Sequence, residues 1–164
     1  MSTGEGVASA AASSATTAAD DVGPVPAPLT RERLRALCAQ VGWSPRVGSE
    51  GELRVTVGLD EVALHQRGEH GEVLLVRATW HTALKVGRCE DVRAFVEEHH
   101  RRSPWPQAHL EVQDQGLVLL HTAQAVDLTE GVTDEQLRRH VADATGAAQT
   151  MFDKLAALLG LREV

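Results

Sequence analysis

Hydrophobic and polar positions follow two different periods along this chain. Three stretches place apolar residues three or four positions apart, which is the period of a helix with one buried face. They cover about 30–42, 90–102 and 133–160. Thr30 is a good N-cap before the first stretch, and the sequence from Thr133 to Gln136 is a capping box before the last. The pattern therefore predicts three amphipathic helices, at the start, middle and end of the folded region.

Five other stretches alternate with period two or are apolar throughout, as strands are. They cover 53–57, 62–66, 73–80, 108–113 and 117–125. VLLVRATW at 73–80 and LVLLHTAQA at 117–125 begin with residues that are apolar on both faces, which is typical of central strands. The order α-β-β-β-α-β-β-α predicts an α+β fold: a single antiparallel sheet with helices packed against it.

The first 28 residues differ in composition from the rest of the chain. They are dominated by Ala, Ser, Thr, Gly and Pro and offer no large side chain to bury. Ordering such a segment would lose conformational entropy without compensation, so 1–28 are predicted to form a disordered tail. The remaining residues, 29–164, are enough for one domain with a hydrophobic core.

The net charge and aromatic content of the chain argue against two classes of binding partner. The formal net charge is −7 and aromatic residues make up 3% of the chain, with no Tyr, so nucleic acid and acidic membranes are not expected as partners. No run reaches the roughly 18 apolar residues of a membrane span, and no basic residue of a secretory signal precedes position 31. Cys38 and Cys89 do not suggest a disulfide framework, so we expect a cytoplasmic protein.

The sequence EEHHRR at 97–102 resembles a site at first sight. Neighbouring helical residues point about 100° apart, so His99 and His100 cannot easily bind one metal ion. His99 continues the apolar face and is interpreted as a packing residue. Arg101 and Arg102 complement the helix dipole, and the two glutamates can pair with them at i, i+4. The cluster is interpreted as the polar end of a helix.

The rest of the sequence offers few residues in patterns typical of catalytic, cofactor or metal sites. The chain contains no phosphate-binding loop, dinucleotide motif or nucleophile elbow, so no catalytic residue and no cofactor is predicted. His65, His109 and His121 fall in predicted strands, and facing strands could bring two of them together. A metal site would need a third ligand, which the sequence does not supply. A metal-binding or small-ligand-binding protein, or an enzyme that uses these histidines, is the alternative hypothesis.

The strand at 73–80 suggests a protein contact. Leu74, Val76, Ala78 and Trp80 would face the helices, and the other side carries Val73, Leu75 and Arg77. If all helices cover one face, Val73 and Leu75 are exposed, and apolar patches rimmed by polar groups usually mark protein contacts. Apolar residues of the last strand are expected beside them: Val118 or Leu119, and Leu120. Val73, Leu75 and Arg77 are therefore predicted contact residues, unless a helix or the tail covers them.

Three landmarks carry a family resemblance: VLLVRATW at 73–80, RSPWPQAHLEV at 102–112 and VDLTEGVTDEQL at 126–137. With the element order, they make residues 30 to about 160 resemble the YbjN family, in its actinobacterial branch. The resemblance implies a regulator of bacterial sensory transduction, with a fold similar to that of type III secretion chaperones, small acidic proteins that often dimerise. It implies a non-enzymatic protein-binding module, acting as a regulator or chaperone-like adaptor, with another protein as partner and a possible homodimer. It transfers no active-site residue, and fold alone is a weak guide to function.

Overall fold

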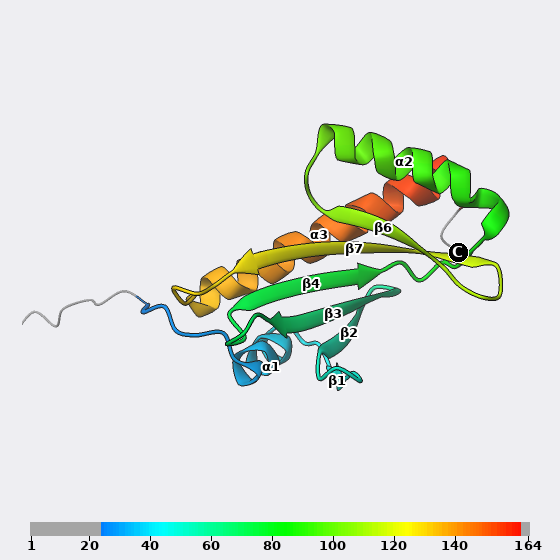
Figure 1. Cartoon of the computed structure of the whole chain (residues 1–164). Coiled ribbons are helices and arrows are strands. Elements are labelled where there is room, and N and C mark those ends of the chain that lie inside the picture. The colour runs from blue at the N-terminus through cyan, green and yellow to red at the C-terminus, as the bar shows by residue number, and fades with distance from the viewer. Residues whose placement is uncertain (1–23, 162–164) are drawn as a thin grey trace, which may run out of the picture.

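The computed structural model describes residues 24–161 and confirms the α+β architecture (Figure 1). One antiparallel sheet of seven strands forms one layer, and three helices pack against it. The helices are α1 (Arg31–Gln40), α2 (Cys89–Arg102) and α3 (Asp134–Leu158), with a 3-10 turn before α2 (Val86–Arg88). The strands are β1 (Arg46–Val47), β2 (Leu53–Val57), β3 (Asp60–Arg67), β4 (Val73–Thr79), β5 (Leu84–Lys85), β6 (Gln107–Val112) and β7 (Leu117–Asp127).

The long strand β7 organises the sheet. Strands β1, β2, β3, β4 and β7 pair in that order, and β6 also pairs with β7. Val118 of β7 has two partners, Leu84 of β5 and Val112 of β6. A strand can pair with neighbours on two sides only. β4 and β5 therefore pair one after the other along one side of β7, and β6 pairs along the opposite side. This arrangement places residues from β3, β4, β7 and β6 side by side across the sheet.

The core lies between one face of the sheet and the three helices. Leu74, Val76 and Ala78 of β4 face it, together with Trp80 just after the strand, as the alternation predicted. Helix α3 packs on β4 and β7, α2 packs on β6, and α1 contacts α3. Phe152 on α3 is almost completely buried and stacks on Trp80, which is also buried. The apolar stripes of the helices and one side of the strands therefore form a single core.

Both predicted helix starts are present. The Thr30 hydroxyl accepts from the amide of Arg33 at 3.2 Å. At α3, the amide of Gln136 donates to the Thr133 hydroxyl at 3.2 Å while the Gln136 side chain accepts from the amide of Thr133 at 2.9 Å. This reciprocal pair satisfies two of the amide groups that a helix start leaves without intrahelical partners.

The end of the predicted tail, residues 24–28, lies within the described part of the chain, and Ala27 contacts the domain. Ala27 forms an antiparallel bridge with Val132, and its carbonyl accepts from Arg33 Nη1 at 2.6 Å. The same guanidinium donates to the carbonyl of Val132 at 2.7 Å and pairs with Asp134 at 2.6 Å. Arg33 thus joins the starts of α1 and α3 to the segment before them. The rest of the predicted tail, 1–23, lies outside the described residues.

Differences from the predicted elements are confined to short or terminal pieces. The structure adds β1 and β5, two residues each, which are too short to show a period. It also extends β3 to 60–67 and β7 to 117–127. Within residues 24–161, no helix has the length and apolar character needed to cross a bilayer.

Candidate functional site

The second face of the sheet carries the candidate site, and we name it the open face. No helix among residues 24–161 packs on it, since all three lie on the core side (Figure 1). Arg77 lies at its centre, paired with Ala63 of β3 and Ala123 of β7. Two small neighbours leave space around the guanidinium, and a cavity of about 290 Å³ opens there. Its charged and imidazole groups belong to Glu50, Arg54, Glu61, His65, Arg77, Glu111 and His121.

All three predicted contact residues lie on this face. Val73, Leu75 and Arg77 are half-buried, and no described helix covers them. Leu75 pairs with His65 on one side and Ala125 on the other, so its immediate neighbours are one imidazole and one methyl group. Val73 and Leu75, the two apolar contact residues, therefore lie next to the polar cavity, which His65 lines.

The larger apolar patch expected around these residues does not form. Val118 and Leu120 are buried in the core, because strand alternation turns the even-numbered residues of β7 toward the helices. Leu119 does line the open face, but it lies beyond His121, which pairs with Thr79 rather than with Leu75. The expectation that they would flank Val73 and Leu75 was wrong, and the open face is more polar than the sequence indicated.

Two of the three strand histidines meet on this face. His109 and His121 are direct cross-strand partners, and their ring centroids lie 5.0 Å apart at 23° between the planes. His65 stays separate on β3, with its Nδ1 3.1 Å from Nη2 of Arg67. Within residues 24–161, no group of three or more His, Cys, Asp or Glu residues is placed to hold a metal ion. The alternative hypothesis of a metal site therefore still lacks its third ligand.

A network around Arg77 connects β4, β6 and β7. Nη2 of Arg77 lies 3.6 Å from Glu111 Oε2 and 3.5 Å from His109 Nε2. His121 Nδ1 lies 2.9 Å from the hydroxyl of Thr79. On its other side, His121 Nε2 lies 3.1 Å from Glu111 Oε2, but the two atoms are not aligned for a hydrogen bond. The Thr79 hydroxyl therefore holds one nitrogen of the imidazole, and the Glu111 carboxylate lies close to the other.

Two buried nitrogen atoms in this network have no hydrogen-bond partner. They are Nε of Arg77 and Nε2 of His121, whose side chain is 5% exposed. Buried polar atoms are nearly always hydrogen-bonded, so each exception indicates a missing partner such as a ligand, a binding protein or an ordered water. Both atoms belong to residues that line the same cavity. The open face therefore carries two nitrogen atoms, Nε of Arg77 and Nε2 of His121, that could bond to a further partner.

The imidazoles of this face favour their neutral form. Burial, followed by the charge of Arg77 and the neighbouring His109, lowers the pKa of His121 to about 4, against the opposing effect of Glu111. Burial and then Arg77 lower the pKa of His109, and burial and then Arg67 lower that of His65. At neutral pH the positive charge of the cavity is therefore that of the arginines.

The EEHHRR sequence is a helix end, as predicted. His99 Nε2 lies 3.1 Å from the carbonyl of Pro106, and His100 Nε2 accepts from the amide of Ala108 at 3.0 Å. Arg101 pairs with Glu97 at 3.7 Å, and Arg102 pairs with Glu98 at 2.5 Å. The two rings lie with their centroids 5.7 Å apart, but each is engaged by a different backbone group, and together they attach α2 to the following turn and to β6.

The family is decided by a match over most of the chain. The model of the YbjN family, described as "Putative bacterial sensory transduction regulator", matches residues 30–157. The chain belongs to the YbjN family. That description is of a regulator and not of an enzyme, and the resemblance drawn from the three sequence landmarks is confirmed at the level of the family.

Two solved structures support the YbjN fold. The first is YbjN from E. coli, described as "a putative transcription regulator", with a TM-score of 0.69 and 17% identity over 82% of this chain and 97% of that one. The second is an uncharacterized protein from Methanothermobacter thermautotrophicus, with a TM-score of 0.51 and 11% identity over 79% of this chain and 98% of that one. No curated protein matches the sequence. At these identities the likeness concerns the fold alone.

Glu111 is the functional candidate that the sequence did not reveal. It follows His109 at the alternate position of β6 and reaches both Arg77 and His121. No spacing rule connects a residue of β4 with one 34 positions later, because the strand register decides which side chains meet. The alternation of His109 and Glu111 toward one side was the available signal.

Proposed function

We propose that this YbjN-family protein is a non-enzymatic regulator that binds another protein through the open face of its sheet. The family description supports the regulatory role. The observation that supports the surface is the pair of buried, unpartnered nitrogen atoms of Arg77 and His121 on a face that no described helix covers. A binding partner would supply the missing acceptors.

The chemistry of the face suggests what the partner presents. Nε of Arg77 can only donate, so it requires an oxygen acceptor. If the Thr79 hydroxyl donates to Nδ1 of His121, the neutral ring carries its hydrogen on Nε2 and becomes a second donor. Leu75 and Val73 lie beside these donors and favour an apolar group. The proposed occupant is an extended protein segment with an apolar side chain next to a carbonyl or carboxylate oxygen.

A binding role fits these groups better than a catalytic one. His121 is held by Thr79 and approached by Glu111, and its pKa of about 4 makes it a weak base at neutral pH. We further propose a cytoplasmic location, which would keep Cys38 and Cys89 reduced. Both are free thiols in the structure. The likeness to type III secretion chaperones stays a prediction.

Replacing Leu75 with Asp tests the proposed surface. We expect tagged Leu75→Asp protein to recover its partner from the native cell at least about tenfold less well than the parent chain, because a charge at the apolar position opposes desolvation. Quantitative mass spectrometry of the co-purified proteins measures the ratio. The matched control is Leu158→Asp on α3, an exposed leucine on the helix side of the molecule.

A supporting result has three parts: one protein is lost with Leu75→Asp, it is retained with Leu158→Asp, and it rebinds the purified parent chain directly. If the occupant is a second copy of the chain, sedimentation shows a dimer of the 17.6 kDa chain that Leu75→Asp converts to a monomer. Equal recovery by both variants, together with an unchanged oligomeric state and normal circular dichroism, would show that the open face is not the contact surface.

A further inference from the structure

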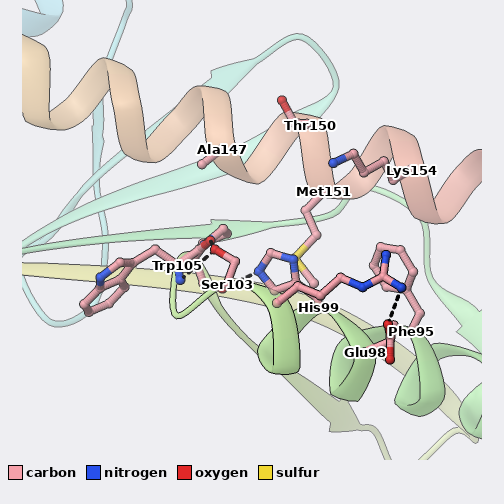
Figure 2. Close-up of a pocket in the computed structure, with 11 residues that line it drawn as sticks. Phe95, Glu98, His99, Ser103, Trp105, Ala147, Thr150, Met151 and Lys154 are labelled. Carbon is pink, nitrogen blue, oxygen red and sulfur yellow. Dashed lines mark hydrogen bonds and ion pairs between the residues drawn. The ribbon is translucent and has the colours of Figure 1, made fainter.

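A second cavity lies on the helix side of the molecule, between α2, α3 and the turn at 103–106 (Figure 2). Its volume is about 410 Å³. Small-molecule sites usually occupy about 300–1,000 Å³ and are lined mainly by apolar and aromatic side chains with a few polar groups. It is larger than the cavity on the open face and is separated from it by the sheet.

The walls of this cavity are mostly apolar. Phe95 and His99 project from α2, and Met151 extends from α3 toward them (Figure 2). Trp105 lies at the rim and is 46% exposed, which is unusual for so large an aromatic side chain. Buried Pro106 completes the apolar lining.

Hydrogen bonds hold the turn that forms one side of the cavity. A carbonyl oxygen can only accept, so His99 donates from Nε2 to the carbonyl of Pro106 at 3.1 Å. The Ser103 hydroxyl donates to the carbonyl of Trp105 at 2.6 Å. The aromatic rim is therefore attached to α2 and does not depend on a ligand for its position, which lowers the entropic cost of binding.

The charges around the cavity have a positive balance. Its ionisable groups, apart from His99, are Arg102, Lys154 and Glu98. Arg102 pairs with Glu98 at 2.5 Å, whereas Lys154 forms no ion pair with any carboxylate of residues 24–161. The ammonium group of Lys154 is solvent-exposed and is therefore available to an anion at the edge of this cavity.

From this combination we propose that the cavity between α2 and α3 binds a small organic anion with an apolar body, such as a medium-chain carboxylate. The apolar body would contact Phe95, Met151 and Trp105, and the carboxylate would pair with Lys154. Arg102 lines the cavity from α2, the other wall, where its charge is already paired with Glu98. A ligand without the negative charge would leave Lys154 unpaired, and a cationic ligand would be repelled.

The test uses decanoate as the probe and equilibrium dialysis of the radiolabelled compound as the measurement. We expect saturable binding to the whole chain with a Kd of about 0.1 mM, the range for a ligand of this size. Lys154→Gln is expected to weaken binding about five- to tenfold. Lys85→Gln is the matched control, because Lys85 is the other of the two lysines and lies exposed on β5. Decanol and decyltrimethylammonium are expected to compete poorly.

Filling the cavity gives a second readout. Ala147 is a small residue on the α3 wall, so Ala147→Phe should abolish decanoate binding while the thermal unfolding curve stays close to that of the parent chain. If Ala147→Phe does not fold, the comparison of Lys154→Gln with Lys85→Gln decides. Absence of saturable binding by the parent chain up to about 1 mM decanoate, ten times the expected Kd, would overturn the proposal. So would equal affinity of the two lysine variants.

This inference is independent of the protein-binding surface. The cavity lies on the helix side, so Leu75→Asp should bind decanoate as the parent chain does. Lys154→Gln should likewise recover the protein partner as the parent chain does. Leu75→Asp therefore tests the protein-binding surface alone, and Lys154→Gln tests the anion site alone.

Discussion

Phe152→Ala is expected to lower the free energy of unfolding by about 3–5 kcal/mol. Phe152 is 1% exposed and its ring stacks on Trp80, with the centroids 6.2 Å apart and 20° between the planes. This contact joins α3 to the end of β4, so truncation removes both buried apolar area and the main aromatic contact between the two layers. The cavity left behind cannot collapse easily between a helix and a sheet.

Urea unfolding followed by circular dichroism measures this change. The matched control is Leu158→Ala, six positions later on the same helix, where the leucine is 62% exposed. We expect that control to change stability by less than about 0.5 kcal/mol. If Phe152→Ala lowered stability by no more than the control, α3 would not be an integral part of the core.

The second large effect is a dependence of stability on pH that originates at His121. The pKa of this imidazole is about 4 in the folded chain, against an ordinary value of 6.5. The unfolded chain therefore binds a proton more readily, and the stability that neutral His121 contributes is fully present above about pH 6.5. It is lost progressively as the pH falls from there to about 4. Between pH 7.5 and 5.0 we expect a loss of about 1–2 kcal/mol from this residue.

Burial is the largest cause of this effect, and the groups that face His121 modify it. Arg77 and His109 disfavour the charged ring, and Glu111 favours it, while Thr79 bonds to Nδ1. Replacing His121 with Asn keeps a polar group near Nδ1 and removes the titration, so urea unfolding of that variant should depend less on pH by this amount. His70→Asn, at an exposed turn, is the control and should keep the parent slope. An unchanged slope in His121→Asn would show that the ring is accessible to solvent.

Much of the architecture was predictable because it is encoded by neighbouring residues. The stripe on α3 and the capping box at Thr133 act within a few residues of each other, so their spacing alone predicts the helix and its start. The alternation in β4 likewise separates Leu74 from Leu75, which fixes which side chain is buried. The interpretation of His99 and His100 as a helix end rests on the same local geometry.

The site was less predictable because it depends on strand register. His109 meets His121 only because β6 and β7 pair with that alignment, and the same register brings Glu111 within reach of Arg77. A shift by one residue would turn these side chains to the core. The expectation that Leu120 would flank Leu75 failed because alternation along β7 turns Leu120 toward the helices. The cavity near Lys154 depends on how α2 and α3 pack, which no local pattern specifies.

Photo-crosslinking from position 75 tests the central claim most directly, namely that the open face contacts a protein partner. A benzophenone amino acid is placed at Leu75, or at Leu158 as the control, and the chain is irradiated in its native cell. The account predicts one discrete adduct from position 75 that disappears when Arg77 is also changed to Glu, and no such adduct from position 158. Adducts from position 158 alone, or from neither position, would contradict it.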